Sequence, residues 1–204
     1  MFFVSSENIP EGVGFQAFGP IHLLWLLGGL ILWVGGCVFY RKLSADKQKI
    51  ALRVLGAYIF LQEMVKNLVL ILQGEFSWGY LPFHLCGINI LLIVFDTIKQ
   101  TKTVRSFLYY FAIPGAALAL LFPNWTEMPV WNFFHIHSFT IHILLVLYPL
   151  LLVTTGQAQL PGMSQTGYSK YETGEKDIPA AVLIKLADLY KTTTDYLLGR
   201  TDKK

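Results

Sequence analysis

Five apolar runs in this chain are each long enough to cross a lipid bilayer, because a spanning α-helix needs about 20 residues. They cover Ile21–Tyr40, Val54–Gln73, Tyr80–Ile98, Val104–Phe122 and Phe133–Thr154. Charged residues make up only 14% of the sequence, well below the roughly 25% of a soluble domain. The sequence therefore predicts an all-α, polytopic membrane helix bundle of about five spans.

The basic residues between these runs predict their orientation. Lysine and arginine gather in the segments Arg41–Arg53 and Lys99–Arg105, whereas residues 1–20, 74–79 and 123–132 contain none. By the positive-inside rule, the N-terminal arm lies outside the cell and the residues after the fifth span are cytoplasmic. Three tryptophans lie in the outer loops, where an interfacial aromatic belt is expected: Trp78, Trp125 and Trp131.

Composition divides the chain into regions. Residues 1–155 contain nine basic and seven acidic residues, whereas residues 163–204 contain seven and six in a much shorter stretch. The sequence thus predicts an extracytoplasmic arm over 1–20, a membrane domain over 21–155, a junction over 156–162 and a charged tail over 163–204. The junction contains the helix-breaking residues Gly156 and Pro161.

Ionisable side chains gather at the predicted outer end of the membrane domain. This end has all five histidines and one of the two cysteines: His22, His84, His135, His137, His142 and Cys86. The middle of the second span adds Glu63, Lys66 and Asn67. Such groups are costly inside a bilayer and usually indicate a functional site. The alternatives are that Glu63 and Lys66 form an ion pair that fixes helix packing, and that His22 is an interfacial anchor.

Cys86 is the candidate nucleophile of this cluster. Only a thiolate attacks, so Cys86 needs a basic neighbour. His84 lies two positions earlier and faces the opposite way on a regular helix, whereas Asn89 shares the face of Cys86. A base must therefore come from another span. The alternative is that Cys86 is a small apolar packing residue, as a lone cysteine in a span usually is.

The fifth span contains the candidate bases. His135 and His142 are seven residues apart and share one face, whereas His137 points elsewhere, so the base is either this pair or His137. A histidine-lined cavity of a small transporter or sensor is the alternative use of these residues. The sequence contains no HExxH or CxxC spacing, so we predict neither a metal site nor another cofactor.

Several motifs occur in the order found in a known membrane protein family. They are Ile21-His-Leu-Leu-Trp25, Gln62-Glu63, Leu81-Pro-Phe-His-Leu-Cys86, Pro114-Gly-Ala-Ala-Leu118 with Phe122-Pro123, and the histidines before Leu144-Leu-Val-Leu-Tyr148. Over about residues 15–155 the chain resembles the YwaF-type integral membrane proteins of bacteria. Members of that family generally have more than five spans, and it is related to a vertebrate transmembrane protein identified as a cysteine-dependent phospholipid acyltransferase.

This resemblance carries expectations about location and chemistry. It implies a multi-pass protein of the bacterial cytoplasmic membrane, with the lipid bilayer as partner and a phospholipid or acyl group as substrate. It also implies that Cys86 is the matching cysteine and that His137 or His142 is its partner.

The tail resembles a different family. Met163-Ser-Gln-Thr-Gly-Tyr-Ser-Lys-Tyr-Glu-Thr-Gly-Glu-Lys-Asp-Ile-Pro179, Leu183-Ile-Lys-Leu-Ala-Asp188 and Asp195-Tyr-Leu-Leu-Gly-Arg200 are similar to the C-terminal half of Cro/repressor (XRE) helix-turn-helix domains. The resemblance implies a recognition helix that carries Gln165, Thr166 and Ser169, with Lys170 as a phosphate contact.

The first helix and the scaffold helix of such a domain are expected before Ser164. That part of the chain instead holds the end of the fifth span and the junction. We therefore expect an incomplete helix-turn-helix that does not bind DNA, and a fusion of two fragments is the simplest account of the whole chain. The competing function is a membrane-tethered XRE-type transcriptional regulator.

Overall fold

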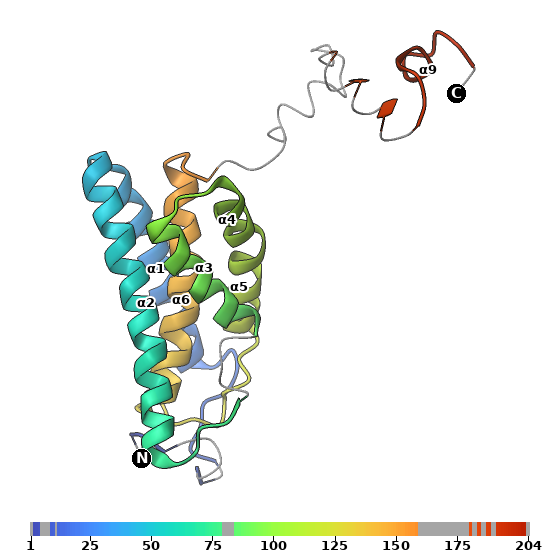
Figure 1. Ribbon diagram of the computed structural model, residues 1–204. Helices are drawn as coiled ribbons and strands as arrows, with labels where there is room; N and C mark the ends of the chain where they lie inside the picture. Colours follow the sequence, from blue (N-terminus) through green and yellow to red (C-terminus); the bar gives the residue numbers. More distant parts are fainter. Residues whose placement is uncertain are drawn as a thin grey trace. The chain divides into compact units, whose positions relative to one another are not determined.

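A computed structural model of the chain describes residues 2–4, 9–10, 12–78, 84–158, 180, 183–184, 187–188 and 191–202. All regular structure in these residues is helical, which confirms the predicted fold class. The chain forms two compact units, Met1–Gln159 and Leu160–Lys204, whose helices are drawn in Figure 1.

The first unit is a membrane helix bundle. Its elements are α1 (Pro20–Arg41), α2 (Ala45–Gln73), α3 (Leu85–Ile98), α4 (Lys102–Phe107), the π-helical turn η3 (Leu108–Ala112), α5 (Ile113–Leu121) and α6 (Phe133–Thr154). Among the described residues, α1, α2, α6 and the combined run Lys102–Leu121 are each long and apolar enough to cross a bilayer. The chain is therefore a multi-pass membrane protein.

The third predicted span is shorter than expected as a helix. The start predicted for it, Tyr80, lies outside the described residues, and α3 begins only at Leu85. With 14 residues, α3 is about 21 Å long, which is less than the roughly 30 Å hydrocarbon core of a bilayer. The N-terminus of α3, next to Cys86, therefore lies below the membrane surface when its other end is at the opposite surface.

Local sequence signals explain where the long helices begin and end. Pro20 occupies the first turn of α1, where its missing N–H costs nothing. Gly74 ends α2 in the left-handed conformation, with φ 73°. The side chain of Asn132 caps α6 by accepting hydrogen bonds from the backbone N–H groups of Phe134 (2.8 Å) and His135 (3.4 Å). α2 begins at Ala45, before the predicted start at Val54. The additional turns at its beginning contain basic residues.

A π-helical turn interrupts the fourth span. It precedes Pro114, which has no backbone N–H to donate to the previous turn. A single π turn is the usual way for a helix to accommodate one extra residue. Helices α4, η3 and α5 thus remain one continuous apolar span.

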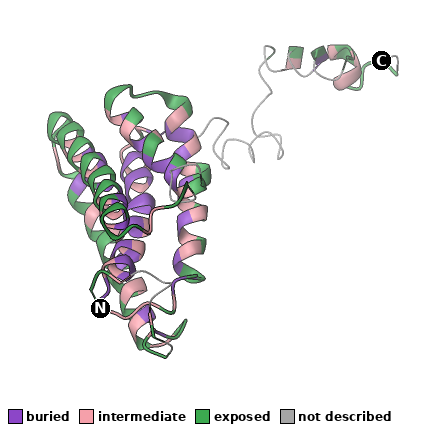
Figure 2. Ribbon diagram, turned by 60° about the horizontal axis from the view of Figure 1, so that its bottom comes forward, coloured by how far each residue is buried: buried purple, intermediate pink, exposed green. Residues whose placement is uncertain are grey.

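Helix α6 is the centre of the bundle. It packs against α1, α2, α3, η3 and α5. Phe139, Leu145 and Tyr148 of this helix are fully buried, whereas Leu24 and Ile31 of α1 are 67% and 64% exposed. Figure 2 shows this contrast between the buried centre and the exposed outer helices. The exposed apolar side chains of α1 and α2 form the surface that contacts lipid.

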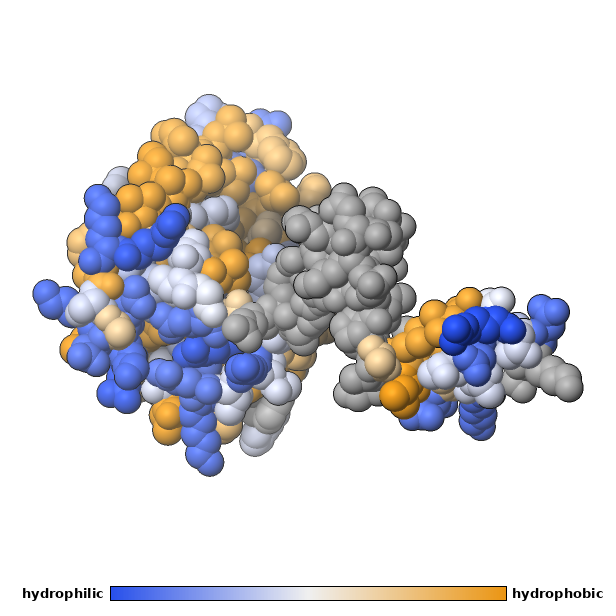
Figure 3. Space-filling model, turned by 90° about the horizontal axis from the view of Figure 1, so that it is seen from above, coloured by the Kyte–Doolittle hydropathy of each residue, from blue (hydrophilic) through white to orange (hydrophobic). Residues whose placement is uncertain are grey.

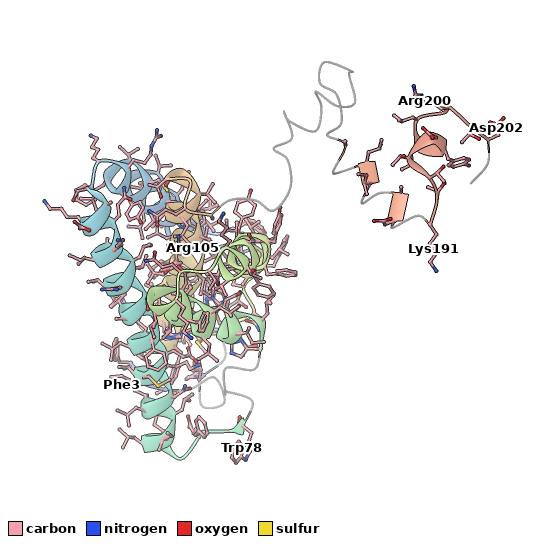
Figure 4. All side chains as sticks on the ribbon, turned by 45° about the horizontal axis from the view of Figure 1, so that its top comes forward. Phe3, Trp78, Arg105, Lys191, Arg200 and Asp202 are labelled. Atoms are coloured by element: carbon pink, nitrogen blue, oxygen red, sulfur yellow. The ribbon has the colours of Figure 1, made fainter. Side chains whose placement is uncertain are left out.

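The two ends of the bundle differ in chemistry. One end, here the basic end, carries the residues Arg41–Arg53 and Lys99–Arg105, and Figure 3 looks onto its hydrophilic surface. The other, the histidine end, carries the start of α1, the end of α2, and the starts of α3 and α6. Figure 4 shows Arg105 within the bundle, away from Phe3 and Trp78 at the histidine end.

A buried ion pair joins the helices toward the basic end. Arg105 Nε lies 2.9 and 3.2 Å from the two carboxylate oxygens of Asp96. The Tyr148 hydroxyl donates to the same carboxylate at 3.0 Å, and Arg105 Nη1 donates to the carbonyl of Gln157 at 3.3 Å. These contacts join α3, α4 and the end of α6. They also pair the two buried charges, either of which would be costly if it were left unpaired.

Candidate functional site

A cavity of about 580 Å³ lies at the histidine end of the bundle. Its walls come from α2, the start of α3, the end of α5, the α5–α6 connection and the first turns of α6. The lining side chains are Glu63, Lys66, His84, Cys86, Ile90, Ala119, Phe122, Asn124, Trp125, Met128, Phe134, His137, Ser138, Ile141 and His142. The cavity thus brings a thiol, three imidazoles and an ion pair together within the membrane domain.

The thiol of Cys86 faces the imidazole of His142. Cys86 Sγ lies 3.5 Å from His142 Nε2, within the range of a hydrogen bond to sulfur. The other ring nitrogen, Nδ1, lies 2.6 Å from the carbonyl oxygen of Ser138. A carbonyl can only accept, so Nδ1 carries the proton and Nε2 presents its lone pair to the thiol. His142 is therefore oriented as a base toward Cys86.

The position of Cys86 on α3 offsets part of the cost of forming a thiolate in a buried site. His84 is the N-cap of α3, and its Nδ1 accepts from the backbone N–H of Gly87 at 3.2 Å. Cys86 is then the second residue of the helix, among the N–H groups that have no partner within the helix. The positive end of the helix dipole stabilises negative charge at this position.

Trp125 covers the base. Its indole ring stacks on the His142 imidazole, with ring centroids 5.3 Å apart and an interplanar angle of 10°. Trp125 is only 7% exposed, yet its indole Nε1 has no hydrogen-bond partner among the described residues. A buried N–H without a partner is costly, and Trp125 is one of the residues that line the Cys86 cavity.

An ion pair lines the same cavity. Lys66 Nζ lies 2.5 Å from Glu63 Oε1, and His137 Nε2 lies 3.7 Å from Glu63 Oε2. Glu63 and His137 are buried, at 3% and 8% exposed. The carboxylate of Glu63 is thus flanked by an ammonium group and an imidazole, as a buried charge requires.

Two of the five histidines lie outside the cavity and bind the helix ends together. His22 accepts from the backbone N–H of Phe18 at 2.8 Å, and its Nε2 lies 2.7 Å from the carbonyl oxygen of Leu120. His135 Nε2 accepts from the Trp25 indole at 3.0 Å, while its Nδ1 lies 3.3 Å from a backbone carbonyl. Both rings use both nitrogens in these contacts.

The two asparagines singled out in the sequence also lie outside the lining. Asn67 and Asn89 are buried, at 9% and 1% exposed. Each has a side-chain oxygen without a hydrogen-bond partner in the described part of the chain. Neither residue is among those that line the cavity of Cys86.

The geometry differs in two respects from what helical spacing predicts. His84 and Cys86 both line the cavity, because His84 precedes the helix as its N-cap, with ψ 161°, and the two-residue rule applies only within a regular helix. In α6, His137 and His142 both line the cavity while His135 does not, because the cavity extends along both α2 and α3.

The sequence does not identify Trp125 as part of the site. Its position in an outer loop predicts a place in an interfacial belt, because tryptophans in such loops are usually found there. No spacing rule links a loop residue to a histidine in the following helix. Among the described residues, no group of three or more histidine, cysteine and carboxylate side chains is arranged to hold a metal ion.

Comparison with known protein families identifies the family of the membrane unit. The family described as the TMEM164 family matches residues 17–166, which is most of the chain and includes the whole cavity. The chain belongs to the TMEM164 family. This TMEM164 family member contains Cys86 and His142 within the matched region. No curated protein and no solved structure matches the chain.

A helix-turn-helix family also matches, over residues 158–197. The residues expected on its recognition helix, Gln165, Thr166, Ser169 and Lys170, lie outside the described residues. In the described part of this unit, α9 (Thr194–Leu197) is capped by Thr193, whose hydroxyl accepts from the N–H of Tyr196 at 3.1 Å. The tail is therefore similar to a helix-turn-helix protein over about 40 residues.

Proposed function

We propose that this chain is a membrane-embedded acyltransferase that moves an acyl group between phospholipids through a thioester on Cys86. The single observation that carries this proposal is the contact between Cys86 Sγ and His142 Nε2 within the cavity. The resemblance of residues 15–155 to the YwaF-type family, which is related to a cysteine-dependent phospholipid acyltransferase, supports it. The direct test is the detection of a thioester-linked acyl group on Cys86 in a phospholipid membrane.

The proposed reaction has two balanced halves. His142 Nε2 takes the thiol proton, and Cys86 Sγ attacks the carbonyl carbon of a phospholipid ester. The carbon–oxygen ester bond breaks, and the departing lysophospholipid oxygen takes the proton from His142. In the second half, His142 takes the proton of an acceptor hydroxyl, whose oxygen attacks the thioester. The carbon–sulfur bond then breaks, and the proton returns to the Cys86 sulfur.

Trp125 supplies a hydrogen-bond donor for the charge that develops in each half. The tetrahedral intermediate carries a negative oxygen, and preorganised N–H groups that face such an oxygen accelerate acyl transfer. Trp125 lines the cavity, and its buried indole N–H has no partner among the described residues. We assign this N–H to the oxyanion.

Replacing Trp125 with phenylalanine tests this role. Phenylalanine keeps an aromatic ring against His142 but removes the N–H, so we expect thioester formation to slow by about 10²–10³-fold. The measurement is the single-turnover rate of acyl transfer to Cys86 in vesicles. Alkylation of Cys86 by a small thiol reagent is the control, and it should not change. An unchanged transfer rate in Trp125→Phe would exclude the indole as the oxyanion donor.

A membrane-tethered transcriptional regulator is the second candidate, and the helix-turn-helix match over residues 158–197 favours it. Two features argue against specific DNA binding. The position of the scaffold helix is occupied by the membrane helix α6, which ends at Thr154, and the junction after it. Residues 163–204 contain seven basic and six acidic residues, so their net charge is only +1. Few phosphates would then be neutralised.

We therefore expect the full chain, placed in nanodiscs, to show no sequence-selective DNA binding. Binding is measured by fluorescence anisotropy with a randomised duplex library. The duplexes that the protein retains are then sequenced. The same experiment at raised salt separates specific from electrostatic binding. Salt-resistant, sequence-selective binding at submicromolar protein would support the regulator and contradict this expectation.

A further inference from the structure

The connection between α5 and α6 forms part of the cavity wall but has no regular structure of its own. It covers residues 122–132, here called the Trp125 loop, and contains no helix or strand. Four of its residues line the cavity: Phe122, Asn124, Trp125 and Met128. Functional side chains on a loop keep their place only where a rigid scaffold holds the loop. The stacking of Trp125 on His142 therefore depends on contacts from outside the loop.

Two buried histidines donate hydrogen bonds to carbonyl groups on either side of Trp125. His22 of α1 accepts from a backbone N–H through Nδ1, so its Nε2 carries the proton and donates to the carbonyl of Leu120 at 2.7 Å. His135 of α6 accepts from an indole N–H through Nε2, so its Nδ1 carries the proton and donates to the carbonyl of Met128 at 3.3 Å. Both residues are 0% exposed. Each histidine is thus held in one neutral tautomer and fixes one end of the segment that contains Trp125.

The N-terminal arm holds the middle of the same segment. The backbone N–H of Phe15 donates to the carbonyl of Thr126, the residue after Trp125, at 2.8 Å. The two backbones lie so close that a Cβ on Gly14 would be 2.1 Å from this carbonyl oxygen and 2.8 Å from the Cα of Glu127. Backbone atoms cannot turn aside as a flexible side chain can, so only glycine fits this close approach.

An aromatic cluster joins these supports to Trp125. Its centre is Phe139 of α6, which is fully buried. The ring centroids of Trp125 and Phe15 lie 5.2 and 5.5 Å from that of Phe139. Phe15 also meets the His135 ring edge-on, at 4.8 Å. The arm, α6 and the loop thus share one packed cluster, and a ring that moves leaves a costly void beside the others.

We propose that His22, His135 and the segment Gly14–Phe15 are positioning residues that hold Trp125 in place over the ring of His142. None of them is among the residues that line the cavity, so they act on the reaction only through the loop. Their effect on acyl transfer rests on the proposed function, whereas the position of the loop can be measured without turnover. The proposal gives a role to the two histidines that share this end of the bundle with the cavity but lie outside its lining.

Oxidative footprinting of the full chain in nanodiscs tests the position of the loop. Hydroxyl radicals oxidise accessible tryptophan rings, and peptide mass spectrometry measures the oxidation of each one. Trp125 is 7% exposed, so we expect little oxidation in the wild type. In Gly14→Ala and His135→Phe we expect about a tenfold increase, the effect of one lost hydrogen bond on the population with a displaced loop.

Three controls accompany the footprint. His135→Gln should keep the protection of Trp125, because an amide can accept one hydrogen bond and donate another as the imidazole does. Gly28→Ala adds the same methyl group as Gly14→Ala, but at a position on α1 where it meets no atom within 4 Å, and should match the wild type. Trp33, whose indole donates to the carbonyl of Ile143 in the bundle, should show the same oxidation in every variant.

A double-mutant cycle adds a readout that a purely structural role would not change. We expect Gly14→Ala to slow thioester formation on Cys86 by about 10²-fold, the cost of displacing a catalytic group by about 1 Å. In the Trp125→Phe background the same substitution should have almost no further effect, because the indole N–H that it displaces is already absent. Equal slowing in both backgrounds would show that Gly14 does not act through Trp125.

Two footprinting outcomes would also overturn the proposal. Wild-type oxidation of Trp125 in both Gly14→Ala and His135→Phe would show that the loop keeps its position without these contacts. A rise in Trp33 oxidation equal to that of Trp125 would show that the substitutions loosen the whole bundle and not the loop in particular. If the wild type forms no thioester, the proposed function fails, and the footprint still decides whether these residues hold the loop.

Discussion

Replacing Cys86 with alanine is expected to abolish phospholipid acyl transfer, with a loss of at least about 10³-fold, because the thiol is the covalent acyl acceptor. The substitution removes one sulfur atom from the wall of a cavity, so the helical fold should persist. Transfer of a labelled acyl chain between phospholipids in vesicles measures the effect.

Cys37 provides the matched control for this experiment. Both cysteines are free and partly buried, but Cys37 lies near the end of α1 toward the basic end, away from the histidines. Cys37→Ala removes the same sulfur atom from the membrane domain and should leave transfer largely intact. Full activity of Cys86→Ala would exclude a thiol nucleophile and favour a transporter or sensor that uses the histidine-lined cavity.

Replacing His142 with glutamine should have the second largest effect. Glutamine approximates the reach of the imidazole but cannot take up the thiol proton, so transfer should fall by about 10²–10⁴-fold. Alkylation of Cys86 by a small neutral thiol reagent should slow as well, because less thiolate forms.

The alkylation rate of Cys37, measured in the same His142→Gln molecules, is the internal control. It should equal the wild-type rate, since Cys37 has no contact with His142. Wild-type transfer by His142→Gln would mean that another group activates Cys86, and His137 would then be the first candidate to examine.

The long spans could be predicted from hydrophobicity alone. The runs Ile21–Tyr40 and Phe133–Thr154 agree with α1 and α6 to within one residue at each end. Such agreement is expected where an apolar run begins and ends at capping residues or charges. The nine residues that extend α2 before Val54 could not be found in this way, because a polar helix outside the bilayer leaves no trace in an apolar run.

The candidate site could be predicted only in outline. Depth in the membrane placed Cys86, Glu63 and the histidines at one end, but depth says nothing about rotation about a helix axis. The rotation of α6 relative to α3 brings His142 to the thiol, and packing determines it. The capping role of His84 and the stacking of Trp125 depend on backbone outside regular helices, to which no periodicity applies.

The most direct test of the whole account is peptide mass spectrometry of the full chain after incubation in phosphatidylcholine vesicles. The account predicts a fatty acyl group on Cys86 that neutral hydroxylamine removes, that is absent from Cys37 and that disappears in His142→Gln. An acyl group found equally on both cysteines would indicate non-specific acylation. A Cys86 that remains a free thiol throughout, in a correctly folded chain, would contradict the proposed function.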